Sequence, residues 1–254
     1  MSLFDAIMLG SIQGITEFLP ISSSGHLVIA QSLLGLELPG NIIEVVTHLG
    51  TLLSVIIIYR KEIIKILLGF KEPLTKKYII FLFIGTIPAA VIGVGAKTFI
   101  SEFFESIKLV SVSLIFTGLI LFLSNKIKTK KSSISINKSL LIGLSQALAI
   151  IPGISRSGMT ITIGTLLGLN PKDAAKFSFL LAIPIISGAG LITAIDLVDQ
   201  PTQISYNILF AALVSSFIVG YISLKWLLGI LESGKLHFFG YYCISLGITT
   251  LMIS

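Results

Sequence analysis

One polar, serine-rich segment occurs twice in a chain that is otherwise strongly apolar. Aligned without a gap, residues 10–37 and 143–170 are identical at ten of 28 positions, among them Gln13 with Gln146. Shared leucines carry little weight in so apolar a sequence, whereas shared glutamine, serine and glycine do. Membrane proteins built from internal repeats keep their binding sites at such interruptions. The repeat therefore predicts one site made from both copies.

The composition places the chain in a membrane. Hydrophobic residues make up 54% of it, charged residues 12%, and the mean hydropathy is +1.00, values typical of integral membrane proteins. The stretches that are apolar and long enough to cross a bilayer are 42–59, 78–96, 107–124, 174–195, 204–224 and 236–253. Runs 60–70 and 225–235 are interpreted as short helices along the membrane surface.

The repeated segments, about 3–36 and 139–169, are apolar but broken near the middle by proline, serine and glycine. Each half is too short to span, and non-helical backbone at membrane depth is tolerated only where protein or water surrounds it. The predicted fold is therefore all-α, with six transmembrane helices and two re-entrant helix pairs. It forms a single membrane domain over 1–254.

Charge distribution gives the orientation. Of the 18 Lys and Arg residues, 15 fall in connections on one side and only Lys97 and Lys108 fall opposite, which places the first set in the cytoplasm. Both termini are then extracytoplasmic, and the net charge of +6 reports topology rather than nucleic-acid binding. Repeat one covers about 1–124, repeat two about 139–254, and a basic cytoplasmic linker about 125–138. Three spans per half invert the second copy relative to the first.

The remaining basic residue is Arg156, inside the second serine loop. An arginine at membrane depth costs about 2.5–3.5 kcal/mol, so it is expected to be paired or functional. The plain alternative is a structural ion pair with Glu17. Anion binding is favoured because the neighbouring groups and the helix that follows suit phosphate oxygens. Those neighbours are the hydroxyls of Ser155, Ser157 and Thr160, and Gly158, which lets the backbone approach closely.

The first copy carries acid–base residues where the second has its arginine. Glu17 follows Gln13 by four residues, so both lie on one helical face, and His26 closes the loop. The loop itself is Ser22, Ser23, Ser24 and Gly25, of which Ser22, Ser24 and Gly25 are expected to bind the phosphate together with the second loop. Serines before a helix are most often N-caps, yet so many polar groups in an apolar segment indicate a divided active site. Ser23 or His26 is the candidate nucleophile or general base.

Three other polar residues carry less weight. Glu44 is read either as an interfacial charge or as an accessory site residue. His48, one turn further along, either faces the same cavity or serves in packing, and packing is favoured. The single cysteine, Cys243, excludes a disulfide framework and a thiolate metal site.

The motifs Q-G-I-T-E-F-L-P-I-S-S-S-G-H (Gln13–His26) and P-G-I-S-R-S-G-M-T (Pro152–Thr160) resemble the two signatures of the undecaprenyl-diphosphate phosphatase family, the bacitracin-resistance type. The resemblance implies a bacterial inner-membrane hydrolase that converts undecaprenyl diphosphate to undecaprenyl phosphate, the lipid carrier for peptidoglycan, with a site open to the outer face.

The same resemblance implies roles for individual residues. It assigns the acid–base residues to Glu17, Ser23 and His26 and the phosphate-binding arginine to Arg156. It also implies a divalent cation, Mg²⁺ or Ca²⁺. Some members have glutamate where this chain has Gln13, so metal binding here rests mainly on Glu17 and substrate oxygens.

A polyprenyl-phosphate flippase is the alternative from another class, because inverted repeats are also the plan of secondary transporters. A transporter needs Arg156 for the phosphate but needs neither His26 nor a metal. The clustering of Glu17, Ser23 and His26 favours the enzyme. The expected partners are the polyprenyl lipid and the membrane; a homo-oligomer is compatible with the sequence, which does not specify one.

Overall fold

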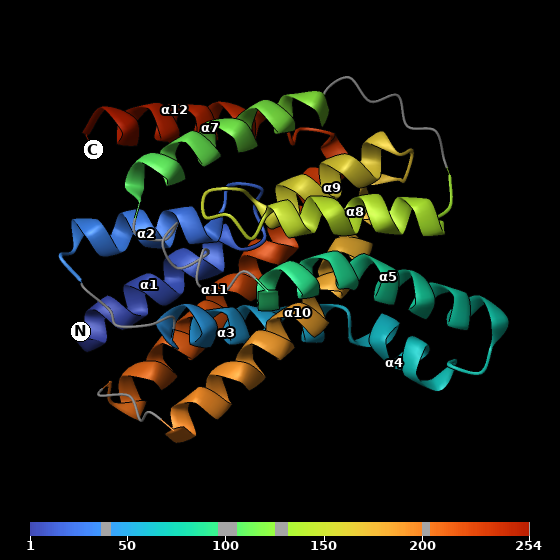
Figure 1. Cartoon of the computed structure of the whole chain (residues 1–254), viewed down its shortest axis with the longest axis horizontal. Helices are drawn as coiled ribbons and strands as arrows, with labels where there is room; N and C mark the ends of the chain where they lie inside the picture. Colours follow the sequence, from blue (N-terminus) through green and yellow to red (C-terminus); the bar gives the residue numbers. More distant parts are fainter. Residues whose placement is uncertain (37–41, 96–105, 125–131, 200–203, 254) are drawn as a thin grey trace.

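The computed structural model describes residues 1–36, 42–95, 106–124, 132–199 and 204–253, and this part of the chain folds into helices without strands (Figure 1). In chain order they are α1 (Leu3–Thr16), α2 (Ser23–Leu33), α3 (Ile42–Ile58), α4 (Arg60–Leu68), α5 (Pro73–Gly95), α7 (Ile107–Leu123), α8 (Ile136–Leu148), α9 (Arg156–Leu166), α10 (Pro171–Asp199), α11 (Tyr206–Ser233) and α12 (Phe238–Ile253).

Three helices, α5, α10 and α11, are long and apolar enough to cross a membrane by themselves. A fourth span results if α3 and α4 count as one, although they meet at a bend of 73°. The outward faces are apolar: Phe83 on α5 is 69% exposed and Phe210 on α11 is 68% exposed. A lipid-facing surface has this character, whereas a water-soluble monomer rarely exposes such patches.

Both serine-rich segments fold into a pair of helices joined by a loop. Helices α2 and α9 begin and end at positions 133 residues apart, which is the offset of the sequence alignment. Their C-termini also match, because Gly35 and Gly168 both have positive φ, 61° and 90°. Glycine adopts this left-handed conformation without the Cβ penalty and ends helices for that reason. The repeat is therefore present in local structure as well as in sequence.

Glycines let the first helix of each pair pack closely against a long helix. Helix α1 packs against α11, and α8 packs against α5. A Cβ atom on Gly10 would lie 2.5 Å from the Ala212 carbonyl oxygen, and one on Gly143 would lie 2.4 Å from that of Gly85. Small residues at such contacts are typical of helix association in membranes, where backbone approach replaces the hydrophobic effect.

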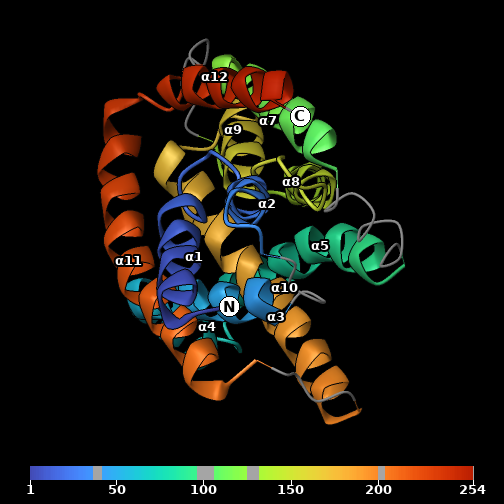
Figure 2. The same cartoon turned by 90° about the vertical axis from the view of Figure 1, so that its left-hand side faces the viewer.

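The two helix pairs approach the centre of the molecule from opposite ends (Figure 1). Both chain termini lie at one end, beside the beginnings of α1 and α7. The opposite end of the molecule holds the N-termini of α5 and α8 and the C-termini of α7 and α9. Helices α7 and α12 lie side by side along one edge, whereas α11 runs along α1 (Figure 2). The two serine loops consequently meet in the interior.

The sequence prediction for 225–235 is wrong. Instead of a separate surface helix, α11 continues without a break from Tyr206 to Ser233. Gly229 lies within this stretch but does not break the helix, and Gly234, with φ 67°, ends it in the left-handed conformation. The prediction for 60–70 is confirmed as a separate helix, α4.

Candidate active site

The two serine loops contact one another directly. Ser157 Oγ donates to the Leu19 carbonyl oxygen at 3.2 Å, across 138 residues of sequence. A Cβ atom on Gly25 would lie 3.1 Å from Gly153 Cα. Glycine at both positions therefore permits the close approach that brings the two copies of the repeat into one site.

Each loop ends in the same serine cap. Gly25 N donates to Ser22 Oγ at 3.3 Å in the first copy, and Gly158 N donates to Ser155 Oγ at 3.1 Å in the second. These bonds satisfy amide groups that a helix N-terminus leaves free. Both α2 and α9 thus direct the positive ends of their dipoles towards the space between the loops.

Ser22 is the non-glycine residue with positive φ, 68°, within the described chain. This backbone costs roughly 1–3 kcal/mol for such a residue and occurs mainly at functional sites. Hydrogen bonds hold it in place: its Oγ lies 3.3 Å from Ser24 Oγ, and its carbonyl oxygen accepts from His26 Nδ1 at 2.7 Å.

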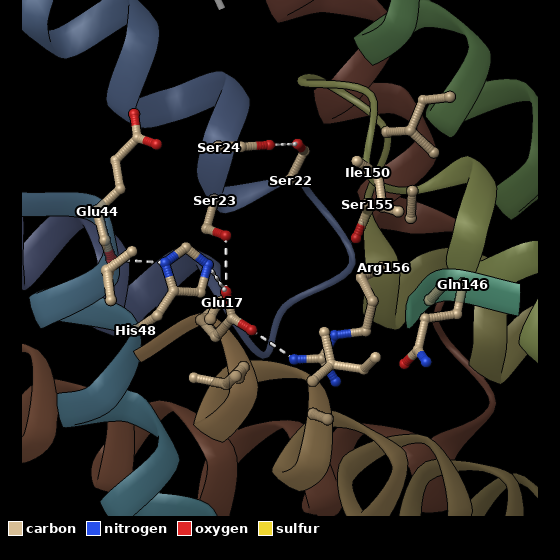
Figure 3. A pocket seen from close by; sticks show the side chains of 18 residues that line it. Glu17, Ser22, Ser23, Ser24, Glu44, His48, Gln146, Ile150, Ser155 and Arg156 are labelled. Carbon is tan, nitrogen blue, oxygen red and sulfur yellow. Dashed lines mark hydrogen bonds and ion pairs between the residues drawn. The ribbon is translucent and has the colours of Figure 1, made fainter. Parts of the chain in front are cut away.

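A cavity of about 290 Å³ opens between the loops (Figure 3). Its polar wall consists of Glu17, Ser22, Ser23, Ser24, Glu44, His48, Gln146, Ser155 and Arg156. The rest of the lining is apolar and comes mainly from α10 and from the loop between α8 and α9. A cavity with one polar wall and one apolar wall fits a ligand that has a charged head and a hydrocarbon chain.

Glu17 is the centre of the polar wall and is 7% exposed. Its Oε2 accepts from Ser23 Oγ at 2.7 Å and from Gln13 Nε2 at 3.0 Å. Its Oε1 forms an ion pair with Arg156 Nη2 from the second loop. The carboxylate therefore joins the candidate nucleophile of one repeat to the candidate anion-binding group of the other.

The ion pair that the sequence offered as the plain alternative for Arg156 is present. The guanidinium also lies 5.7 Å from the centre of the Phe179 ring, and its Nη1 lies 3.5 Å from the Ser178 carbonyl oxygen. The side chain keeps 16% of its surface exposed and faces the cavity (Figure 3). Binding of an anion by Arg156 stays a prediction. The ion pair does not exclude it, because the guanidinium has five N–H donors.

His48 lines the cavity, contrary to the packing role that its sequence position indicated. Its Nε2 lies 3.4 Å from Glu17 Oε2, and its Nδ1 donates to the Glu44 carbonyl oxygen at 2.7 Å. Glu44 lines the same cavity. The spacing of four residues puts both on one face of α3, and this is the only signal in the sequence that could have joined them to the site.

His26 does not line this cavity. Its Nε2 lies 2.7 Å from Tyr242 Oη, and its ring stacks on that of Tyr242 at 5.6 Å between centres. Through Nδ1 it holds the Ser22 carbonyl oxygen. The structure thus places His26 behind the first serine loop, where it can position the loop.

The remaining predicted residues support the loops from within. Ser157 bonds across to the first loop, and Gly25 and Gly158 lie at the closest approaches. Thr160 Oγ1 lies 2.6 Å from Ser178 Oγ and faces α10 rather than the cavity. Of the hydroxyls predicted to bind phosphate, those of Ser22, Ser24 and Ser155 line the cavity.

A preformed metal centre is absent from the described residues: no group of three or more His, Cys, Asp or Glu side chains could hold an ion there. Gln13 and Glu17 each carry a side-chain oxygen one helical turn apart, although Gln13 turns its amide nitrogen towards Glu17 and does not line the cavity. Gln13 Oε1 is buried and has no hydrogen-bond partner within the same residues. Two protein oxygens fit a hard divalent cation that takes its other ligands from phosphate and water.

Comparison with known proteins covers nearly the whole chain. Residues 6–249 match the family model described as Bacitracin resistance protein BacA. The chain is 40% identical over 258 residues to undecaprenyl-diphosphatase 1 of Bacillus cereus, which covers 97% of this chain and 96% of that protein. It is 40% identical to undecaprenyl-diphosphatase of Carboxydothermus hydrogenoformans, over 100% and 98% of the two chains. It is 38% identical to that of Methanosphaera stadtmanae, over 100% and 99%.

Proposed function

Because the chain belongs to the bacitracin resistance protein BacA family, we propose that it hydrolyses undecaprenyl diphosphate to undecaprenyl phosphate and inorganic phosphate. The family resemblance expected from the two motifs is confirmed by relatives that match end to end. The observation that carries the proposal is the contact between Ser23, Glu17 and Arg156. It brings a hydroxyl, a carboxylate and a guanidinium together on one wall of the cavity, which supports their proposed roles as nucleophile, base and phosphate-binding cation. The reaction recycles the lipid carrier for peptidoglycan and accounts for the resistance in the family's name.

Ser23 is the nucleophile in this proposal, because its hydroxyl lines the cavity and already donates to a carboxylate. Its Oγ attacks the terminal phosphorus, the bond from that phosphorus to the bridging oxygen breaks, and undecaprenyl phosphate leaves. The serine proton passes to Glu17. Water then attacks the phosphorus of the phosphoserine, the bond from phosphorus to Ser23 Oγ breaks, and Oγ takes its proton back from Glu17. Inorganic phosphate leaves with the two protons of the water. His26, the other candidate, contributes by holding the Ser22 carbonyl oxygen.

Arg156 and the amino end of α9 bind the phosphate in this scheme. A guanidinium binds phosphate through paired hydrogen bonds, and helix N-termini attract anions. Arg156 gives up part of its contact with Glu17 when phosphate enters. The exchange releases the carboxylate to receive the serine proton, so substrate binding and base activation are linked through one ion pair.

A divalent cation, Mg²⁺ or Ca²⁺, is proposed to bind together with the diphosphate, held by Glu17, by Gln13 Oε1 and by substrate oxygens. Such an ion neutralises charge on the phosphate oxygens. Because the protein supplies so few ligands, we expect titration calorimetry to show weak binding of Mg²⁺ to the substrate-free protein. Tight binding without lipid would contradict a site shared with the substrate.

We also propose six spans and two re-entrant helix pairs in an inverted repeat, in the bacterial inner membrane, with both termini extracytoplasmic. Helices α7 and α12 are apolar at 17 and 16 residues, close to the length a span needs. Support for the orientation comes from Lys71, Lys76 and Lys138, which lie by the beginnings of α5 and α8, away from both termini. Lys97 and residues 125–131 of the basic linker lie outside the described residues.

Labelling of single cysteines tests this topology, since the native Cys243 is buried. In whole cells, an impermeant maleimide is expected to modify Ser2→Cys and to leave Lys71→Cys unmodified. The reverse pattern contradicts the proposed orientation.

The function itself is tested by phosphate release from undecaprenyl diphosphate with purified protein, in Mg²⁺ or Ca²⁺ and in EDTA. Arg156→Ala and Ser23→Ala are expected to abolish release. Ser11→Ala, which removes a hydroxyl bonded only to the Ile7 carbonyl oxygen, is the matched control. Protein that releases no phosphate but moves a polyprenyl phosphate across vesicle membranes would be the flippase instead.

A further inference from the structure

Gln146 lines the cavity, but neither polar atom of its side-chain amide has a hydrogen-bond partner among the described residues. The residue, on α8, is only 3% exposed. Burial of an amide without hydrogen bonds costs free energy, and such groups are rare in folded proteins. An unpartnered amide in the wall of a ligand cavity indicates that the ligand supplies the partner.

The repeat shows which partner is missing. The counterpart of Gln146 in the first copy is Gln13, whose Nε2 donates to Glu17 Oε2 at 3.0 Å. At the offset of 133 residues, the counterpart of Glu17 is Ile150. Ile150 lines the same cavity and accepts no hydrogen bond through its side chain. The second copy therefore keeps the amide donor but lacks the carboxylate that satisfies it.

The surroundings of Gln146 suit an anion. Figure 3 shows the amide beside Arg156, on the side away from Glu17 and Glu44. The other lining residues from this stretch of the chain, Ala149 and Ile150, are apolar. A phosphate that entered here would meet a guanidinium and an amide, with Glu17 on the other side of the guanidinium and Glu44 across the cavity.

We propose that Gln146 is a phosphate-binding residue, whose Nε2 donates to a non-bridging oxygen of the phosphate that Arg156 binds. The inference rests on the proposed phosphatase function and adds a contact from the second repeat. The amide breaks no existing hydrogen bond when it turns into the cavity, because it has none. A neutral donor binds the phosphate similarly before and during transfer, so Gln146 is a positioning residue that acts mainly on substrate affinity.

Gln146→Met tests the proposal because it keeps the length of the side chain and removes the donor. We expect the KM for undecaprenyl diphosphate to rise about tenfold and kcat to change by less than about twofold. The inhibition constant of inorganic phosphate is expected to rise in parallel. Gln146→Glu is expected to raise KM further than Gln146→Met does, because a carboxylate repels phosphate.

Thr162→Val is the matched control. Thr162 is also on the second helix pair, is fully buried, and has an unpartnered hydroxyl, but it does not line the cavity. Both Gln146→Met and Thr162→Val are expected to keep or raise the melting temperature, since each removes an unsatisfied polar group. Only the first is expected to change KM.

The proposal is overturned if Gln146→Met leaves KM and the phosphate inhibition constant within about twofold of wild type, or if Thr162→Val raises KM equally. Wild-type turnover is measured first, and its absence refutes the phosphatase function alone. In that case protection against thermal unfolding by inorganic phosphate decides: equal protection of wild type and Gln146→Met refutes the role of Gln146, and weaker protection of the variant supports it.

Discussion

Replacing Glu17 by glutamine separates the two tasks of this carboxylate. One oxygen accepts from Ser23 and Gln13, and the other pairs with Arg156. The amide oxygen is expected to stay on the Ser23 side, because an NH₂ group there would face the NH₂ of Gln13. The amide nitrogen then faces Arg156, and the two groups cannot form a hydrogen bond because both are donors. Glu17→Gln thus retains the hydrogen bond to Ser23 but can neither take its proton nor hold the arginine.

The size of each effect follows from these contacts. Loss of a general base lowers turnover by about 10²- to 10⁴-fold, so kcat is expected to fall by that factor. Arg156 becomes free for phosphate, so KM is expected to stay unchanged or to fall. Breaking a buried ion pair costs about 3–5 kcal/mol, but the partly exposed Arg156 side chain faces a cavity. The loss in the free energy of unfolding is therefore expected to be below that range.

The assay is steady-state phosphate release over a range of lipid concentrations, beside thermal unfolding of the same preparations. Glu72→Gln is the control, because Glu72 is an exposed carboxylate outside the cavity that accepts a hydrogen bond from Thr75 Oγ1 at 3.4 Å. A kcat within about tenfold of wild type would refute the role of Glu17 as base. A raised KM at unchanged kcat would instead make it a binding residue.

Three further predictions follow from the same contacts. Ser23→Ala is expected to lower kcat by about 10³-fold or more without loss of folding, and the failure to trap a phosphoserine in wild type would contradict a serine nucleophile. Arg156→Lys keeps the charge but loses the paired hydrogen bonds of the guanidinium, so KM is expected to rise about tenfold. An unchanged KM would show that a point charge is enough to bind the phosphate. Gly143→Ala is expected to destabilise the protein by about 1–3 kcal/mol because its Cβ would meet the Gly85 backbone. Gly229→Ala, with nothing within 4 Å of its Cβ, is the control, and equal melting temperatures for the two would refute the packing argument.

Sequence alone predicts the helix pairs because their signals are local. Serine caps and glycines mark the beginnings and ends of α2 and α9, and these marks recur at a fixed offset. The continuation of α11 to Ser233 was missed because lysine and tryptophan at 225–226 resemble a membrane boundary, although neither residue breaks a helix.

The site was harder to predict because its contacts are distant in the sequence. His48 reaches Glu17 from another helix, α3, and no spacing rule connects the two. His26 follows the serine motif directly, yet a helical turn carries it away from the cavity to Tyr242. The pairing of Glu17 with Arg156 could be predicted, because the repeat predicts one site made from both copies and each copy carries one of the two residues.

That pairing spans 139 residues of chain, which has a consequence for biosynthesis. A ribosome at about 5–20 residues per second therefore adds Glu17 about 7–28 seconds before Arg156. A polypeptide stopped before the second loop carries the candidate nucleophile but lacks Arg156, so it is expected to have no activity. Synthesised as two separate fragments divided within 125–131, the protein is expected to regain turnover only when both fragments share a membrane. Turnover therefore requires translation to continue past the second loop.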